Sequence, residues 1–277
     1  MCGILAMFSA EAGACAAPAL EARWVRAMER LRPRGPDGEG QWLGDDGRVR
    51  LGHRRLAIVD LTDAGLQPMT NEDGAIVVTC NGEIYNAPSL RRELESLGHR
   101  FRSTCDIEVI LHGYEEWGSR GVIDRLRGMF AFSLWDARTR SVLACVDHVG
   151  MKPLCFAQIG GALAMASTTD ALIELMADTP ALNATALCHI LCHGYIPGTE
   201  TVWNGVRRLG AGQAMEWSPG RGEPRVWRWW EPSRAQGACN AAERDEQFKA
   251  IWREVVSDHL LSDVPVRLLL SGGLDST

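Results

Sequence analysis

The sequence contains no apolar run that approaches the roughly 18 residues needed to span a bilayer. Its N-terminus also lacks a basic stretch followed by an apolar core, so we expect no secretory signal. The nine cysteines are an odd number without a framework of short spacings, which favours reduced thiols and predicts a cytoplasmic protein. No basic cluster offsets the net charge of -6, so neither a nucleic-acid-binding surface nor a membrane partner is expected.

What is present is an ordinary globular composition, with 46% hydrophobic and 23% charged residues over 277 positions. A chain of this length can bury a substantial core and form one or two domains. Residues 218–237 are rich in Pro, Gly, Arg and Trp, which predicts a linker. The boundary between two domains is therefore expected near this stretch.

Hydrophobic periodicity predicts both helices and strands. Helices are expected over 18–31, 89–97, 106–117, 184–191 and 241–261. Strands are expected over 3–8, 49–60, 75–80, 129–135, 141–146, 154–158, 162–166, 202–209, 214–217 and 264–270. Asn81-Gly82 predicts a tight turn after the β-branched strand 75–80, whereas Ser89 and Asp106 are expected to cap the helices that they begin.

The first candidate for chemistry is Cys2, which precedes Gly3 and an apolar run. Initiator Met is generally removed before a small residue, which would place a thiol and a free α-amine on Cys2. The amine has a pKa near ~8, so it can accept the thiol proton and generate a nucleophilic thiolate. The ordinary alternative is a small apolar residue at the start of a strand.

Four further stretches join Cys2, of which residues 34–37 form a stiff loop and the others supply polar groups. Arg55 offers a guanidinium fork that suits a carboxylate. Asn81 and Gly82 offer a side-chain amide and an unhindered backbone N–H, which is the donor pair of an oxyanion hole. Glu83 and Asp106 offer carboxylates for an ammonium group. Each has an ordinary alternative, namely a surface charge, a hairpin turn or a helix cap.

Together, and in this order, the stretches resemble class II glutamine amidotransferases of the N-terminal-nucleophile family, and most closely the glutamine-hydrolysing asparagine synthetases. The resemblance rests on residues 2–4, 34–37, 53–60, 81–86, 106–110, 126–132, 150–154, 194–198 and 271–276, and extends over essentially the whole chain. It implies an α+β fold, a four-layer αββα sandwich of two antiparallel sheets, over residues 2–215. A linker over 216–240 would follow, and then the first helix and strand of an incomplete α/β ATP-pyrophosphatase domain over 241–277.

The resemblance also implies roles for individual residues. Cys2 would be the nucleophile, and Asn81 and Gly82 would stabilise the oxyanion. The glutamine α-carboxylate would be held by Arg55 near the backbone of Leu56, Ile58 and Val59, and its α-amino group by Glu83 and Asp106. Glutamine hydrolysis itself would need no cofactor, and the resemblance allows a homodimer.

A second motif follows the expected strand 264–270. The resemblance implies that its residues form a pyrophosphate loop with an Mg²⁺-associated Asp: Leu269, Leu270, Ser271, Gly272, Gly273, Asp275 and Ser276. ATP, Mg²⁺ and aspartate would serve a complete synthetase. One strand cannot build a parallel nucleotide-binding sheet, so no working ATP site is expected in this chain.

Several features leave alternatives open. Pro33, Val146 and the triplet 167–169 depart from the family pattern at positions that support the pocket and the domain contact. The cluster of Cys and His at 188–193 lacks a second ligand pair, so a packed helix without metal is expected. The acceptor of the ammonia could instead be a sugar, a peptide or an unusual amino acid, or the chain could be a non-catalytic remnant. The sequence leaves open whether the chain is a fragment or a genuine short protein.

Overall fold

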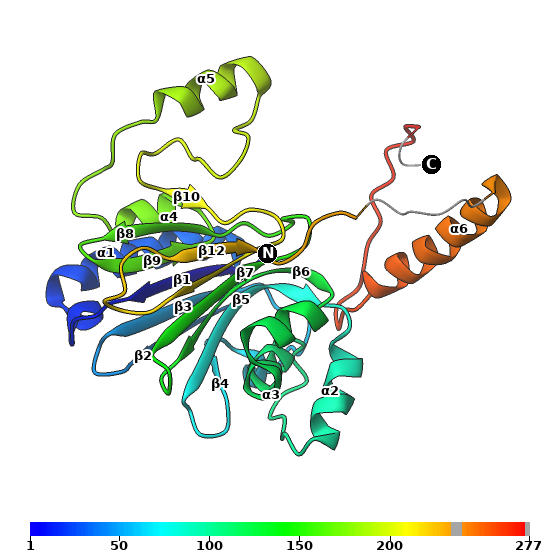
Figure 1. Ribbon diagram of the computed structural model, residues 1–277, viewed down its shortest axis with the longest axis horizontal. Helices are drawn as coiled ribbons and strands as arrows, with labels where there is room; N and C mark the ends of the chain where they lie inside the picture. Colours follow the sequence, from blue (N-terminus) through cyan, green and yellow to red (C-terminus); the bar gives the residue numbers. More distant parts are fainter. Residues whose placement is uncertain (234–239, 275–277) are drawn as a thin grey trace.

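The computed structural model describes residues 1–233 and 240–274, and two antiparallel sheets stacked face to face dominate it (Figure 1). The first sheet has the order β10-β8-β9-β1-β3-β2 and the second β12-β11-β7-β6-β5-β4. The strands of the first sheet are β1 (Gly3–Phe8), β2 (Gly38–Gly44), β3 (Val49–Arg55), β8 (Cys155–Ile159), β9 (Ala162–Ala166) and β10 (Arg207–Arg208). Those of the second are β4 (Met69–Thr70), β5 (Ile76–Ile84), β6 (Gly128–Asp136), β7 (Ser141–Val146), β11 (Gln213–Trp217) and β12 (Arg225–Arg228).

Helices cover the two outer faces of this sandwich. On the first sheet lie α1 (Pro18–Leu31) and α4 (Thr169–Glu174), and on the second lie α2 (Ala87–Ser96) and α3 (Glu108–Arg125). Two further helices, α5 (Ala184–His193) and α6 (Ala241–Asp258), project away from it (Figure 1). Short 3₁₀ turns occupy Ala14–Ala16, Arg32–Arg34 and Asp63–Gly65. The expected four-layer αββα fold is confirmed.

The apolar run of β1 follows from burial on both of its faces. Ile4, Ala6 and Phe8 point between the sheets, where the Phe8 ring stacks on Trp135 with centroids 6.0 Å apart. Leu5 points to the opposite face, beneath α1. Because alternate residues face opposite sides of a sheet, a strand covered on both sides is apolar throughout.

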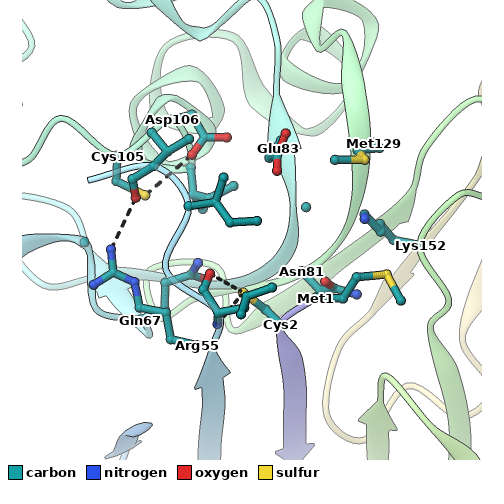
Figure 2. Close-up of a pocket in the computed structure, with 16 residues that line it drawn as sticks. Met1, Cys2, Arg55, Gln67, Asn81, Glu83, Cys105, Asp106, Met129 and Lys152 are labelled. Atoms are coloured by element: carbon teal, nitrogen blue, oxygen red, sulfur yellow. Dashed lines mark hydrogen bonds between the residues drawn. The ribbon is translucent and has the colours of Figure 1, made fainter. Parts of the chain in front are cut away.

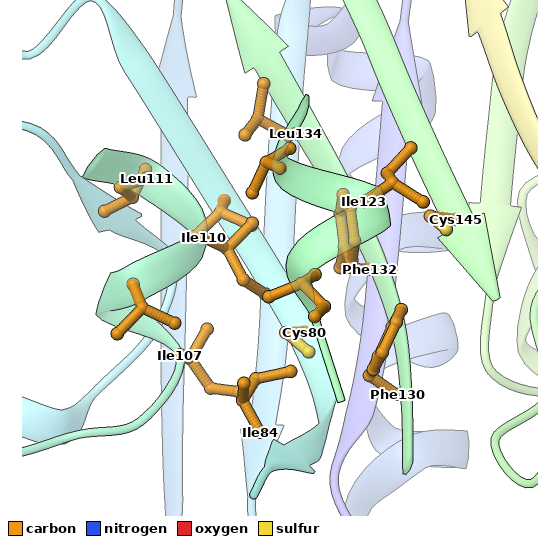
Figure 3. Packing of buried hydrophobic residues seen from close by; sticks show 14 of the residues in the cluster. Cys80, Ile84, Ile107, Ile110, Leu111, Ile123, Phe130, Phe132, Leu134 and Cys145 are labelled. Atoms are coloured by element: carbon orange, nitrogen blue, oxygen red, sulfur yellow. The ribbon is translucent and has the colours of Figure 1, made fainter. Parts of the chain in front are cut away.

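A second apolar core lies between the second sheet and α3 (Figure 3). Ile107, Ile110 and Leu111 pack on side chains of β5 and β6, among them Ile84 and Phe132. All five of these side chains are at most 2% exposed. This packing fixes the start of α3 against the end of β5, and that junction borders the candidate site described below.

Several local expectations differ from the structure. α2 begins after Asn86, so Ser89 is not its cap, and α3 begins after Ile107 rather than at Asp106. The strand expected over 49–60 ends at Arg55, and only Arg207–Arg208 of 202–209 forms a named strand. Asn81-Gly82 is not a turn, because both residues continue β5 and pair with Ala131 and Phe130 of β6.

The C-terminal part also differs from expectation. Part of the expected linker forms β12, which pairs with β11 and so belongs to the second sheet. α6 forms as expected, and the exposure of its apolar side chains, including Phe248 and Trp252, agrees with the expectation that residues 241–277 pack poorly in this chain. The expected buried strand 264–270 does not form in the described segment, and Leu268 and Leu269 are exposed. A strand without a hydrogen-bonding neighbour has nothing to stabilise it. None of the described helices is long and apolar enough to cross a membrane.

Candidate functional site

A cavity of about 200 Å³ lies where β1 begins and where β3 and β5 end (Figure 2). It is lined by all nine residues predicted for the glutamine site, namely Cys2, Arg55, Leu56, Ile58, Val59, Asn81, Gly82, Glu83 and Asp106. The strand pairing explains why these residues lie together. β1 is antiparallel to β3, with Gly3 opposite Arg54, so the residue before β1 lies beside the residues that end β3. The end of β5 in the facing sheet forms another wall.

The Cys2 thiol is held by the backbone of Leu56. Leu56 N donates to Sγ at 3.4 Å, and Sγ lies 3.6 Å from Leu56 O. Burial raises the pKa of this thiol, although the contact with Leu56 opposes that shift. A desolvated thiol stays protonated at neutral pH, so it needs a nearby base to become a nucleophile.

The loop 34–37 braces this nucleophile-bearing segment. Arg34 Nε donates to Cys2 O at 3.0 Å, and Asp37 Oδ2 accepts from Ala57 N at 2.9 Å. Gly35 lies so close to the backbone of Arg54 that any side chain would collide with it. The rigid loop therefore positions both the N-terminus and the segment that follows β3.

Both residues predicted as oxyanion donors, Asn81 and Gly82, line the cavity. Asn81 is 1% exposed, and its Nδ2 has no hydrogen-bond partner among the described residues. Such an unpaired buried donor is uncommon and costs stability, which is a reason to look for a ligand. Gly82 lies directly against Phe130 of β6, where a Cβ would collide with the Phe130 backbone.

Strand geometry aims the Gly82 N–H at the same cavity. Alternate N–H groups of a strand point to the same edge. Cys80 N and Ile84 N both point away from β6, because they donate to Gln67 Oε1 and Asp106 Oδ2, each at 2.6 Å. Gly82 N lies between them on this edge, next to the lining of the cavity. The adjacent residues Asn81 and Gly82 can thus each offer an N–H donor at the wall of this cavity.

Arg55 is 6% exposed and organises the loop that follows it. Its Nη1 donates to Thr62 O at 2.7 Å, and its Nη2 donates to Val59 O at 3.3 Å and to Asp60 O. A guanidinium carries five N–H donors, so a share of its capacity is committed to the protein backbone. Arg55 therefore both shapes the cavity wall and brings a positive charge to it.

Two carboxyl groups, those of Glu83 and Asp106, line the same cavity as that arginine. Burial raises the pKa of Asp106 to about 6, although its hydrogen bond from Ile84 N opposes the shift. Burial likewise raises the pKa of Glu83, with the charge of Asp106 adding to the effect. The buried Asp106 and the half-buried Glu83 bring two carboxyl groups to one cavity, which suits the binding of an ammonium group whose charge would relieve their repulsion.

The cavity contains further residues that the sequence analysis did not assign. Lys152 is 8% exposed, and its backbone N donates to Asp147, whose carboxylate also accepts from Phe130 N. Gln67 holds Cys80 N and thereby the edge of β5. Lys152 lies inside a stretch that carries the resemblance, so its position was signalled, whereas nothing in the sequence marked Gln67.

The segment predicted as a nucleotide loop lies elsewhere. Leu269, Leu270 and Ser271–Gly273 belong to an exposed, irregular stretch, with Leu269 93% exposed. No described strand or helix N-terminus orients their N–H groups, so these residues do not fit ATP with its Mg²⁺. Asp275 and Ser276 lie outside the described residues. Cys188 and Cys192 of α5 are exposed, which contradicts the packed role expected for them.

A model of the family described as "Glutamine amidotransferase domain" matches residues 1–230. The chain belongs to this family. It is a class II amidotransferase domain, homologous over its full length to the N-terminal half of asparagine synthetases.

The amidotransferase domain is 37% identical to a "Putative asparagine synthetase [glutamine-hydrolyzing]" of Mycobacterium tuberculosis, over 100% of this chain and 45% of that protein. It is 36% identical to "Asparagine synthetase [glutamine-hydrolyzing] 3" of Arabidopsis thaliana, over 100% of this chain and 41% of that protein. The chain thus spans less than half the length of these curated relatives.

Solved structures share the fold of the amidotransferase domain. One is titled a glutamine phosphoribosylpyrophosphate amidotransferase from B. subtilis complexed with ADP and GMP. It superposes with a TM-score of 0.59 at 18% identity, over 83% of this chain and 50% of that one. Another, titled the structure of the allosteric regulatory enzyme of purine biosynthesis, gives 0.60 at 18% identity over 83% and 49%.

The departures noted in the sequence surround the site of the amidotransferase domain. Pro33 lies in the turn Arg32–Arg34 that delivers Arg34 to Cys2. Ser167 Oγ accepts from Ile4 N at 3.0 Å and so holds the start of β1. Thr168 Oγ1 is buried without a hydrogen-bond partner in the described part of the chain. Val146 ends β7, and its carbonyl accepts from Trp229 Nε1 at 3.2 Å. None of these side chains lines the cavity.

Proposed function

We propose that this chain hydrolyses glutamine to glutamate and ammonia with the Cys2 thiol as nucleophile, after removal of Met1. The observation that carries the proposal is the buried Asn81 Nδ2, which has no hydrogen-bond partner among the described residues and lies at the wall of the cavity that also contains Cys2 and Gly82. The membership of the glutamine amidotransferase family supports glutamine as the substrate.

The reaction begins when the α-amine of Cys2 accepts the thiol proton and the thiolate attacks the side-chain carbonyl of glutamine. The carbonyl oxygen becomes an oxyanion, which Asn81 and Gly82 stabilise by hydrogen bonds. The tetrahedral intermediate collapses, the C–N bond breaks, and the leaving nitrogen takes the proton as ammonia. Water then attacks the thioester, releases glutamate and returns the thiol.

Binding is proposed to use charges on opposite walls. The Arg55 guanidinium attracts the α-carboxylate, and Glu83 with Asp106 attracts the α-ammonium group. Residues of the loop 56–59 line the cavity between Arg55 and the two carboxyl groups. These groups all belong to the chain itself, and we propose that the hydrolysis uses no cofactor.

The use of the ammonia is a separate part of the proposal. Because curated relatives are named glutamine-hydrolysing asparagine synthetases, we propose that the ammonia serves asparagine formation from aspartate and ATP when a synthetase domain is available. The residues 269–273 do not form a phosphate site here, so ATP should change neither the rate nor the product of this chain.

The experiment measures glutamate release by the purified chain, with intact mass to report the loss of Met1. The assay is run with and without ATP, Mg²⁺ and aspartate. Turnover should require Cys2. The matched control is Cys188→Ser, which removes an exposed thiol that does not line the cavity and should leave turnover unchanged. ATP-dependent asparagine formation by this chain, or no glutamate from folded protein that has lost Met1, would overturn the proposal.

A further inference from the structure

Four side chains with metal-binding atoms meet on the far side of the second sheet from β1. Glu72 comes from the turn between β4 and β5, His99 follows α2, and His112 and Glu115 lie one turn apart on α3. One ligand atom of each lies within 4.8 Å of the others. None of these residues takes part in the chemistry proposed for the cavity around Cys2.

His112 is the member that its surroundings leave unexplained. It is 1% exposed, yet neither ring nitrogen meets a hydrogen-bond partner among the residues that the structure describes. Its Nε2 lies 3.5 Å from Glu108 Oε1, and its Nδ1 lies 3.5 Å from Glu72 Oε2. A neutral imidazole has a single N–H. Its other nitrogen is a hydrogen-bond acceptor, and here it must face a carboxylate oxygen that is also an acceptor.

The buried carboxylate of Glu108 indicates which nitrogen carries the proton. Glu108 is 5% exposed and is held by Arg102 N at 2.7 Å and by Ser103 N at 3.0 Å. It faces Nε2, so the proton belongs there, and the Nδ1 lone pair points to Glu72. A histidine whose N–H side is turned toward a carboxylate and whose other nitrogen remains open has the usual arrangement of a metal ligand.

The other members have compatible surroundings. His99 Nε2 lies 3.3 Å from a carboxylate oxygen of Glu116. Arg138 Nη2 contacts Glu115 Oε1 at 2.7 Å and Asp73 Oδ2 at 2.6 Å, so it can remain on Asp73 when Glu115 turns. A surface hollow of about 300 Å³ gives access, and it is lined by Asn71, Glu72, Asp73, His99, Glu115 and Arg138.

We propose that Glu72, His99, His112 and Glu115 bind one divalent transition-metal ion of the zinc type. Two imidazole nitrogens and two carboxylate oxygens are a donor set that Zn²⁺ accepts in four-coordinate geometry. With bonds of about 2.0–2.1 Å, ligand atoms around such an ion stand about 3.4 Å apart. The cluster must therefore contract slightly, and the exposed Glu72 and half-buried Glu115 are the side chains that move.

The ion would join the β4–β5 turn and the segment after α2 to the first turns of α3. A ligand that binds only the folded state stabilises it in proportion to the logarithm of its concentration over Kd. The role is therefore structural, and it is independent of glutamine turnover.

The test titrates the chelator-stripped full chain with Zn²⁺ and with Co²⁺. We expect one ion per chain by equilibrium dialysis, a rise in Tm with Zn²⁺, and visible d–d bands with Co²⁺ that report nitrogen and oxygen ligands. His99→Asn and Glu115→Gln change accessible side chains, and each should weaken binding at least about 10-fold with the circular dichroism spectrum unchanged. His112→Asn should do the same where it folds.

The matched control is Cys188→Ser with Cys192→Ser, because α5 carries exposed cysteines and a stacked His189–His193 pair that could bind the same ions. This control should keep the site. Two results would overturn the proposal. One is wild-type protein that takes up no ion at micromolar Zn²⁺. The other is binding that survives His99→Asn and disappears in the α5 control.

Discussion

The backbone N–H of Ile84 donates to Oδ2 of Asp106 at 2.6 Å and so joins the end of β5 to the start of α3. β4 pairs with β5 only as far as Val78, so the edge beyond it lacks a neighbouring strand among the described elements. Gln67 and Asp106 take the N–H groups of Cys80 and Ile84 on this edge. The Gly82 N–H lies between them on this edge, so Asp106 supports the strand edge that carries the N–H we propose as an oxyanion donor.

The first prediction concerns Asp106→Asn and pH. Burial raises the pKa of Asp106 to about 6, so wild-type protein loses this negative charge as pH falls through about 6. The KM for glutamine should therefore rise on that limb. Asp106→Asn keeps a side-chain oxygen for Ile84 N but has no charge, so its KM should be high already at pH 8 and flat down to pH 5. Steady-state kinetics across this range measures both.

The same shift predicts the stability profile. The folded protein binds the Asp106 proton more tightly than the unfolded chain, whose reference pKa is 3.8. Protonation thus stabilises the fold, fully below about pH 4, and this contribution is lost as pH rises through about 6. In thermal melts, the Tm of Asp106→Asn should lack this pH-dependent gain in stability. A wild-type KM that stays constant from pH 8 to pH 5 would contradict the assignment.

The second prediction is that Asn81→Ala loses activity but not stability. Removing one oxyanion donor typically lowers kcat by about 10²–10³. Because Asn81 Nδ2 has no hydrogen-bond partner among the described residues, its removal deletes an unsatisfied buried donor rather than a bond. The Tm should therefore stay within a few degrees of wild type. The matched control is Asn71→Ala, which removes an acceptor for Ile76 N and should lower Tm with kcat unchanged.

A loss of stability in Asn81→Ala with normal kcat would assign Asn81 to the fold instead. Calorimetry and glutaminase kinetics on the same preparations separate the two outcomes.

The third prediction compares Arg55→Ala with Arg55→Lys. A charge-assisted bidentate contact is worth about 2–3 kcal/mol, so Arg55→Ala should raise the glutamine KM about 30-fold or more. Arg55→Lys keeps the charge but cannot hold Thr62 O and Val59 O together. It should therefore recover only a small part of the affinity. An unchanged KM in Arg55→Ala would remove this residue from the substrate site.

The two-sheet core was predictable because its strands are marked by composition and periodicity. β1 is apolar throughout, and the β-branched strand over 75–80 was identified from its residue types. The prediction of a turn at Asn81-Gly82 is wrong, because the pairing of β5 with β6 continues to Ile84 and overrides the local preference. Neither residue has the positive φ that such a turn requires. Strand pairing in the folded protein therefore sets the conformation of a segment for which the local sequence favours a turn.

Residue chemistry nominates Cys2, Arg55, Asn81, Gly82, Glu83 and Asp106, and the resemblance assigns their roles and adds Leu56, Ile58 and Val59. The structure brings all nine to one cavity. Their roles remain predictions for the experiments above. Gln67 was missed because its contribution is a hydrogen bond to Cys80, which has no sequence signature. The cluster around His112 was missed for a similar reason, since its ligands come from three segments and lack a regular spacing. The Cys and His pattern at 188–193 was conspicuous, yet α5 leaves both cysteines exposed.

The last prediction concerns Asp263, which connects the C-terminal segment to the wall of the cavity. Asp60 N donates to Asp263 Oδ2 at 2.7 Å, and Asp263 N donates to Ile58 O at 2.9 Å. These contacts clamp the loop whose residues Ile58 and Val59 line the glutamine cavity. Asp263→Ala should loosen that loop and raise the glutamine KM about 3–10-fold, since a partly buried hydrogen bond of this kind is worth about 1 kcal/mol.

The chemical step should stay intact, because Asp263 does not line the cavity, so kcat should change less than KM. Asp263→Asn keeps an oxygen acceptor and should lie between Asp263→Ala and wild type. The matched control is Glu254→Gln, which alters a solvent-exposed contact with Arg127 at 3.7 Å and should leave both constants unchanged. If Asp263→Ala leaves KM unchanged, as Glu254→Gln should, then contacts within the sandwich hold the loop. A KM effect confined to Asp263 would make the C-terminal segment part of the glutamine site.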